Sequence, residues 1–204
     1  MSVAEAGAVI IRYIDELEAS VRHVRTSMEP MLGRALAAIL EKQRKTLGWD
    51  GEIEGDLEGP AWFAPKEWKT PGDVQDNHDL FIEFNRKDCD DGDSTDTWVG
   101  AFCEFAGSCV QFAFDTNTQG VRPWRAILRN ETDIIDELKS LGFRCDPRTG
   151  ELTLRVTIDR DLLAQAFITD EFDLALEPAA LALNRIQAAR GPLDRLVAAI
   201  RKKA

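Results

Sequence analysis

The chain has 204 residues, 44% of them hydrophobic, and its ten Phe and five Trp can fill a proper core. Its formal net charge of −11 argues against direct binding to nucleic acid, because phosphates need a basic surface. No apolar run approaches the roughly 18 residues of a membrane span, and no basic leader precedes the apolar stretch near the start. We therefore expect a cytoplasmic protein that does not enter a membrane.

The negative charge is concentrated in the middle of the chain. Residues 1–49 hold 6 acids and 7 bases, residues 50–96 hold 15 acids and 4 bases, and residues 97–204 hold 15 acids and 14 bases. The middle segment alone therefore has a net charge of −11, and we call residues 50–96 the acidic segment.

The first 48 residues have the pattern of amphipathic helices. Five apolar residues recur at steps of four and three, which places them on one helix face: Ile10, Ile14, Leu17, Val21 and Val24. Pro30 predicts a break or kink at residues 27–30, and a second helix over residues 31–47 is expected to end at Gly48. Both helices are predicted to cover a sheet.

The stretch DGEIEGDLEG places an acid at every second position: Asp50, Glu52, Glu54, Asp56 and Glu58. Its three glycines disfavour a helix. In an extended strand these acids share one face, while Ile53 and Leu57 point to the other. Two interpretations stay open. The row is either a charged edge strand that blocks edge-to-edge aggregation, or a recognition face for a basic partner.

Period-two alternation predicts three successive strands over residues 79–87, 97–107 and 109–116. The polar loops between them favour hairpins, so the pairing is expected to be antiparallel. Residues 62–68, in a proline-rich stretch, are predicted to add an irregular edge strand.

The remainder of the chain is predicted to contain a helix, a hairpin and further helices. The helix within residues 129–143 has Asn130 as its N-cap and Gly142 as its stop, and residues 143–159 form a hairpin with its turn at 146–150. A final helical stretch follows. Asp161 or Thr169 is expected to cap this stretch. Pro178 and the pair Gly191-Pro192 are expected to divide it.

These elements predict one α+β domain over residues 1–204, with an antiparallel sheet of about four to six strands covered by N-terminal and C-terminal helices. Residues 1–48 are expected to be helical, residues 49–128 rich in strands, and residues 129–204 to form the helix, hairpin and helices.

A second acidic cluster invites a calcium-binding interpretation: Asp88, Asp90, Asp91, Asp93 and Asp96. Aligning Gly92 with the invariant glycine of an EF-hand loop places Lys87 at the first ligand position and Trp98 at the last. The match therefore fails at both ends. Loose cation binding and a solvated hairpin tip stay open, and the hairpin tip is favoured.

The sequence gives little support for a zinc site, because the chain has only His23 and His78 and no Cys-x-x-Cys pair. The shortage of histidine also argues against catalysis by a nucleophile that a histidine base activates. The four cysteines are expected to be reduced thiols: Cys89, Cys103, Cys109 and Cys145. No cofactor is predicted.

A metal-dependent nuclease needs carboxylates and a lysine at the ends of neighbouring strands. Glu83 and Glu104 are the candidate carboxylates, and Lys87 is misplaced for the lysine. Aromatic and basic residues also alternate around Arg122, Trp124 and Arg125, but two short stretches of this kind do not make a groove for single strands.

The sequence therefore favours a non-enzymatic protein that binds a basic protein partner through the acidic segment. Inhibition of a nucleic-acid-handling partner by mimicry of nucleic acid is one form of this hypothesis. The alternative is a metal-dependent hydrolase with Mg²⁺ or Mn²⁺, or a degenerate nuclease-like fold, using strand-end carboxylates.

Overall fold

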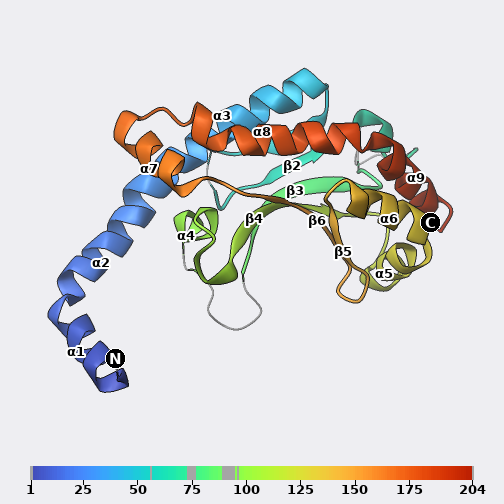
Figure 1. Ribbon diagram of the computed structural model, residues 1–204. Coiled ribbons are helices and arrows are strands. Elements are labelled where there is room, and N and C mark those ends of the chain that lie inside the picture. The colour runs from blue at the N-terminus through green and yellow to red at the C-terminus, as the bar shows by residue number, and fades with distance from the viewer. Residues whose placement is uncertain (1, 56, 73–76, 89–94, 96, 204) are drawn as a thin grey trace.

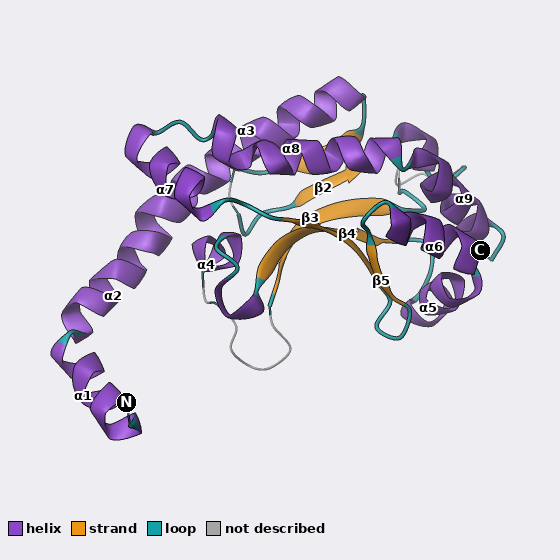
Figure 2. Ribbon diagram, in the orientation of Figure 1, coloured by secondary structure: helices purple, strands orange, loops and turns teal. Residues whose placement is uncertain are grey.

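The computed structural model describes residues 2–55, 57–72, 77–88, 95 and 97–203. Within these residues the chain is an α+β protein with one six-stranded antiparallel sheet in the order β1-β2-β3-β4-β6-β5 (Figure 2). The strands are β1 (Asp50–Ile53), β2 (Ala61–Ala64), β3 (Phe81–Lys87), β4 (Cys109–Asp115), β5 (Arg144–Asp146) and β6 (Glu151–Val156). The predicted antiparallel sheet is confirmed.

Two long helices cover one face of this sheet. Helices α3 (Glu29–Leu47) and α8 (Asp173–Ala188) lie side by side over the strands (Figure 1). Helix α9 (Arg190–Arg201) continues from α8 and packs against α5 (Val121–Asn130) and α6 (Thr132–Ser140) at the end of the sheet where the C-terminus lies. The helical cover of the sheet therefore comes from both halves of the chain.

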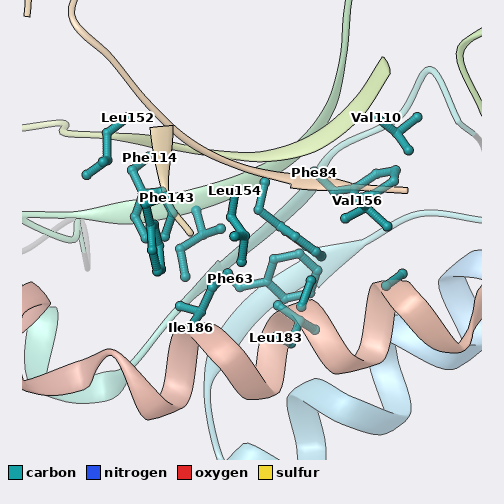
Figure 3. Packing of buried hydrophobic residues seen from close by; sticks show 14 of the residues in the cluster. Phe63, Phe84, Val110, Phe114, Phe143, Leu152, Leu154, Val156, Leu183 and Ile186 are labelled. Carbon is teal, nitrogen blue, oxygen red and sulfur yellow. The ribbon is translucent and has the colours of Figure 1, made fainter. Parts of the chain in front are cut away.

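The main core lies between the sheet and α8. Alternate residues of β3 and β4 face the helices, as the alternation predicts, and Ile82 and Phe112 are fully buried among them. Figure 3 shows Phe63 and Phe84 from the strands opposite Leu183 and Ile186 of α8. The strand assignments for residues 81–87 and 109–115 are thus confirmed.

The predicted strand over residues 97–107 is wrong. Residues Trp98–Phe102 form a short helix, α4, and Phe105–Gly107 form a 3₁₀ turn, η3. The Thr97 side chain caps α4 by accepting a hydrogen bond from the Gly100 backbone N–H at 3.1 Å. Glu104 has a φ of 53°, which a strand does not accommodate. Trp98 and Phe102 are buried from one short helix, whereas Phe105 in η3 is exposed.

The strand predicted over residues 62–68 is present in its first part as β2, but its predicted edge position is wrong. Strand β2 ends at Ala64, and a 3₁₀ turn, η2 (Lys66–Trp68), follows it. Strand β2 pairs with β1 on one side and with β3 on the other, so it is an inner strand. The edge position belongs to β1, because the acidic row folds back on β2 as a hairpin.

The predicted capping of the later helices needs correction. Asn130 is the last residue of α5 and does not cap α6, whereas Gly142 follows α6 with a φ of 90°, as a helix stop requires. The N-cap of α7 (Arg160–Thr169) is Asp159, whose side chain accepts hydrogen bonds from two backbone N–H groups of the first turn. Asp161 and Thr169 lie inside that helix.

The expected hairpin over residues 143–159 is confirmed as β5 and β6. Pro178 does not divide the final helical stretch. It lies inside α8, whose packing against α3 and the sheet outweighs one missing backbone hydrogen bond. The interruption comes at Ala189, and the Gly191-Pro192 pair falls in the first turn of α9.

The first two helices do not cover the sheet, contrary to the expectation. Helices α1 (Val3–Arg12) and α2 (Ile14–His23) have no buried residue. They project from the body of the protein, with the N-terminus at the far end (Figure 1). A π-helical turn, η1 (Val24–Met28), joins them to α3, and Pro30 lies in the first turn of α3 directly after it. We call residues 3–23 the arm.

Among the described residues, no helix is both long and apolar enough to cross a membrane. Cys103, Cys109 and Cys145 are free thiols, as expected, and burial raises the pKa of Cys145 to about 11. Cys89 lies outside the described residues.

Candidate functional site

The acidic row of residues 50–58 forms the edge hairpin of the sheet. Strand β1 ends at Ile53, and the backbone N–H of Glu54 donates to the carbonyl oxygen of Pro60 at 3.0 Å, which closes the turn. Strand β1 therefore includes only the first four residues of the row. The expectation that all five acids share one face is wrong, while Ile53 and Leu57 do pack against the core as predicted.

The described acids of this row have different surroundings. The Asp50 carboxylate is half-buried, 3.5 Å from Lys69 Nζ. Glu58 accepts a hydrogen bond from Trp98 Nε1 at 2.7 Å. Glu52 and Glu54 are exposed. Asp56 lies outside the described residues.

Most of the second acidic cluster also lies outside the described residues: Asp90, Asp91, Asp93 and Asp96. Asp88 is described, and its carboxylate lies 3.4 Å from Arg86 Nε. The geometry of this cluster as a binding face is therefore not given by the structure, and its role stays a prediction.

Bases from the C-terminal helix neutralise part of the acidic segment. The Asp79 carboxylate is almost fully buried, and its Oδ2 lies 2.6 Å from Arg201 Nε. Glu67 lies 3.3 Å from Arg190 Nη2. These two acids serve the packing of α9 against the loop after β2. Glu52 and Glu54 are exposed acids of the β1 hairpin, and we call these two residues the acidic edge.

The carboxylates considered for a hydrolase do not form a metal centre in the described part of the chain. Glu104 Oε1 lies 3.0 Å from Arg155 Nη2, and Lys87 Nζ lies 2.6 Å from Glu151 Oε2. Glu104 and Lys87, two of the groups considered for a hydrolase, are thus each held in an ion pair. Among the described residues, no three His, Cys, Asp or Glu side chains gather closely enough to bind a metal ion.

A polar hollow of about 350 Å³ lies on the sheet face opposite α8, and its lining includes Lys87, Gln111, Thr153 and Arg155. The Gln111 amide donates to Asn85 Oδ1 at 3.2 Å. Within this lining Lys87 pairs with Glu151, and Arg155 pairs with Glu104 outside it. The buried Arg155 Nε has no hydrogen-bond partner among the described residues.

Glu83 lies on the same polar face, on β3. Although its carboxyl keeps contact with solvent, burial raises its pKa, and the neighbouring Asp115 carboxylate raises it further. The folded protein therefore holds this proton more tightly than the unfolded chain. As the pH rises through the folded-state pKa, the unfolding free energy falls, because the charged form is disfavoured only in the folded state.

We expect Glu83→Gln to raise the melting temperature at neutral pH. The gain should vanish at about pH 3, where the carboxyl is protonated in both states. Scanning calorimetry of wild type and variant at the two pH values measures this, with Glu52→Gln on the exposed edge as the control. A lower melting temperature for Glu83→Gln at neutral pH would show that the Glu83 charge stabilises the fold.

The aromatic and basic stretch around Trp124 is structural. Trp124 is buried, and its Nε1–H donates to the carbonyl oxygen of Gly150 at 2.8 Å. Arg125 Nε donates to the carbonyl oxygen of Thr149 at 3.0 Å. Helix α5 thus holds the turn of the β5–β6 hairpin, and Trp124 is not available to stack on a base.

The arm is an exposed apolar surface that the sequence reasoning assigned to the core. Its side chains Ile14, Leu17 and Val21 are 40%, 47% and 43% exposed. The apolar residues of this helix face recur at steps of four and three, in the arm and at the first residue of η1: Ile10, Ile14, Leu17, Val21 and Val24. A helix that covers a sheet has the same spacing, so the sequence does not separate an exposed arm from a covering helix.

The acidic edge and the base of the arm adjoin. Arg25 and Glu29, where the arm meets the body, line one hollow together with Gly55 and Glu58 of the edge hairpin. The site is therefore a protein surface with charged and apolar parts. Comparison of the chain with protein-family models, with curated proteins and with solved structures finds no match. The functional conclusion accordingly rests on the fold and on this surface.

Proposed function

We propose that the protein is a non-enzymatic, cytoplasmic interaction module that binds a basic protein partner through its acidic edge. The observation that carries this proposal is the position of Glu52 and Glu54, which are exposed on and just after the edge strand β1. They lie in a segment whose net charge equals that of the whole chain.

The electrostatics of such a surface act mainly on the rate of association. Carboxylates on one edge attract a basic partner over roughly a Debye length, about 8 Å at physiological salt, and steer it toward the surface. Strand β1 is the edge strand of the sheet, and an extended segment of a partner can add to such an edge. A nucleic-acid-handling protein is one partner with the required basic charge.

Mimicry of nucleic acid is the less supported form of this proposal. A duplex carries one charge per roughly 1.7 Å of its axis. The described hairpin turns at Glu54 and uses Glu58 to hold Trp98, so its carboxylates do not continue in a line. Partner binding through the edge needs no such line.

The test is Glu52→Gln/Glu54→Gln. With a partner recovered from the host at low salt, we expect slower association in stopped-flow measurements and a weaker dependence of the rate on salt. The melting temperature should stay the same or rise slightly, because the change removes repulsion between like charges.

The matched control is Glu171→Gln/Glu177→Gln, which removes the same charge from exposed positions near α8. This control should keep the wild-type association rate. Equal rates and salt slopes for both variants would leave the acidic edge with no role beyond preventing edge-to-edge aggregation.

A further inference from the structure

The polar hollow on the sheet face opposite α8 is lined by side chains that the strands β4, β5 and β6 hold in place. Thr153 of β6 is only 6% exposed, and it pairs across strands with Arg144 of β5. Directly opposed residues share one face of a sheet, with Cβ atoms roughly 5 Å apart. Arg155 follows Thr153 by two positions on β6 and therefore has its side chain on the same face. The two arginines thus flank Thr153 in the lining of the hollow.

The protein satisfies the Arg155 guanidinium only in part. Its Nη2 lies 3.0 Å from Glu104 Oε1, but neither Arg155 Nε nor Glu104 Oε1 has a hydrogen-bond partner among the described residues. The two charges are therefore in contact without an aligned hydrogen bond. A guanidinium has five N–H donors in a planar fork that suits a carboxylate. The Arg155 side chain is 27% exposed, so this fork can also donate to a ligand in the hollow.

Arg144 supplies a positive charge that no described carboxylate matches. Each other charged residue of the lining has a partner of opposite charge, within or beside the hollow: Lys87 with Glu151, Asp146 with Arg148, Asp88 with Arg86, and Arg155 with Glu104. Arg144 is exposed and pairs with no carboxylate in the part of the chain that the structure describes. The four pairs cancel, so one positive charge remains, although the chain as a whole has a net charge of −11.

The Cys109 thiol, which also lines the hollow, senses the sign of this charge. Burial raises its pKa. The positive charges of Arg155, Arg144 and Lys87 oppose that rise, whereas the Glu104 carboxylate adds to it. Three bases and one acid therefore act on the same point in the wall, which favours a negative charge inside the hollow.

We propose that this hollow binds a small monocarboxylate, held by the guanidinium groups of Arg144 and Arg155 and by the Thr153 hydroxyl. One excess positive charge matches a carboxylate better than a phosphate group, which carries nearly two negative charges at neutral pH. The volume of about 350 Å³ lies at the small end of ligand pockets. This site is separate from the acidic edge and does not depend on its role.

Gln111 indicates what else the ligand carries. It is 8% exposed, and its amide donates to Asn85 Oδ1 at 3.2 Å. Its carbonyl oxygen accepts no hydrogen bond from another described residue. This oxygen is therefore free to accept a hydrogen bond from a hydroxyl group of the ligand. A small hydroxy acid combines that group with a carboxylate.

An NMR titration with sodium glycolate, the smallest hydroxy acid, tests the site at constant ionic strength. We expect the backbone amide signals of Arg144, Thr153 and Arg155 to shift and to saturate, with a dissociation constant of about 1–10 mM for so small a ligand. Glycolamide has nearly the same shape without the charge and should leave these signals in place. Tighter binding of inorganic phosphate than of glycolate would overturn the assignment to a carboxylate.

Arg144→Gln distinguishes this site from general attraction of anions. The change is at an exposed position without an ion pair, so the melting temperature should stay at the wild-type value while the glycolate dissociation constant rises at least about tenfold. Thr153→Val, which keeps the shape and the charge of the lining, should raise it at least about threefold.

The matched control is Arg129→Gln, which removes the same charge from an exposed position on α5 and should bind glycolate like the wild type. Equal dissociation constants for the Arg144 and Arg129 variants would overturn the proposal. The absence of any saturable shift in the wild-type protein up to about 100 mM glycolate, far above the expected constant, would also overturn it.

Discussion

Phe112→Ala is expected to lower the unfolding free energy by about 3–5 kcal/mol, the range for truncation of a buried phenylalanine. Phe112 lies at the centre of β4, the strand between β3 and β6, and no part of its side chain reaches solvent. Its ring packs edge-on against Phe84 at 5.2 Å and Phe63 at 6.0 Å between ring centres. Removing the ring leaves a cavity that three strands border.

Chemical denaturation of wild type and variant measures this loss. The matched control is Phe105→Ala, because Phe105 in η3 is 61% exposed, and its truncation should change the unfolding free energy by less than about 1 kcal/mol. Similar losses at the two positions would mean that β4 does not form the centre of the core.

The second large effect is expected at the ion pair between Asp79 and the last residue of α9. Arg201 Nε lies 2.6 Å from Asp79 Oδ2, and Arg201 Nη2 donates to the carbonyl oxygens of Glu67 and Lys69 at 3.0 and 2.8 Å. The Asp79 side chain is only 2% exposed. Arg201 is therefore the charge that compensates a buried carboxylate and also joins α9 to the loop after β2.

Arg201→Met should lower the unfolding free energy by about 3 kcal/mol, because it leaves the Asp79 carboxylate buried without a counter-charge. Adding Asp79→Asn should restore much of this loss, since the neutral amide oxygen can still accept the hydrogen bond that Thr70 Oγ1 now donates at 3.0 Å. Thermal and chemical denaturation of the single and double variants give both values.

Arg195→Met provides the control within the same helix. Arg195 pairs with Glu137, and both side chains are about half exposed, so this change should cost less than about 1 kcal/mol. An equal loss for the Arg195 and Arg201 variants would mean that the burial of Asp79 does not set the strength of its ion pair.

The sequence was sufficient for elements whose local pattern and tertiary environment agree. Strands β3 and β4 alternate apolar and polar residues because one face of each is buried, so the alternation identified them. The β5–β6 hairpin was likewise found from its turn residues. Helix α4 was missed because a five-residue helix has too few turns to show a helical period, and its aromatic residues mimic an alternating strand.

For the candidate site, the sequence located the acidic charge but not its surroundings. Five acids at alternate positions predict a common face only if the strand continues, and whether it continues depends on the hydrogen bond between Glu54 and Pro60. The neutralisation of Asp79 by Arg201 joins residues 122 positions apart. A pattern within a short stretch of sequence has no information about contacts of this kind.

The arm shows the same division. The sequence by itself determined an amphipathic helix in the first residues, because spacing at steps of four and three places the apolar side chains on one face whatever they pack against. Only the tertiary structure decided that this face lies away from the sheet. The physical reason is that α3 and α8 pack over that face of the sheet, and the arm continues beyond them.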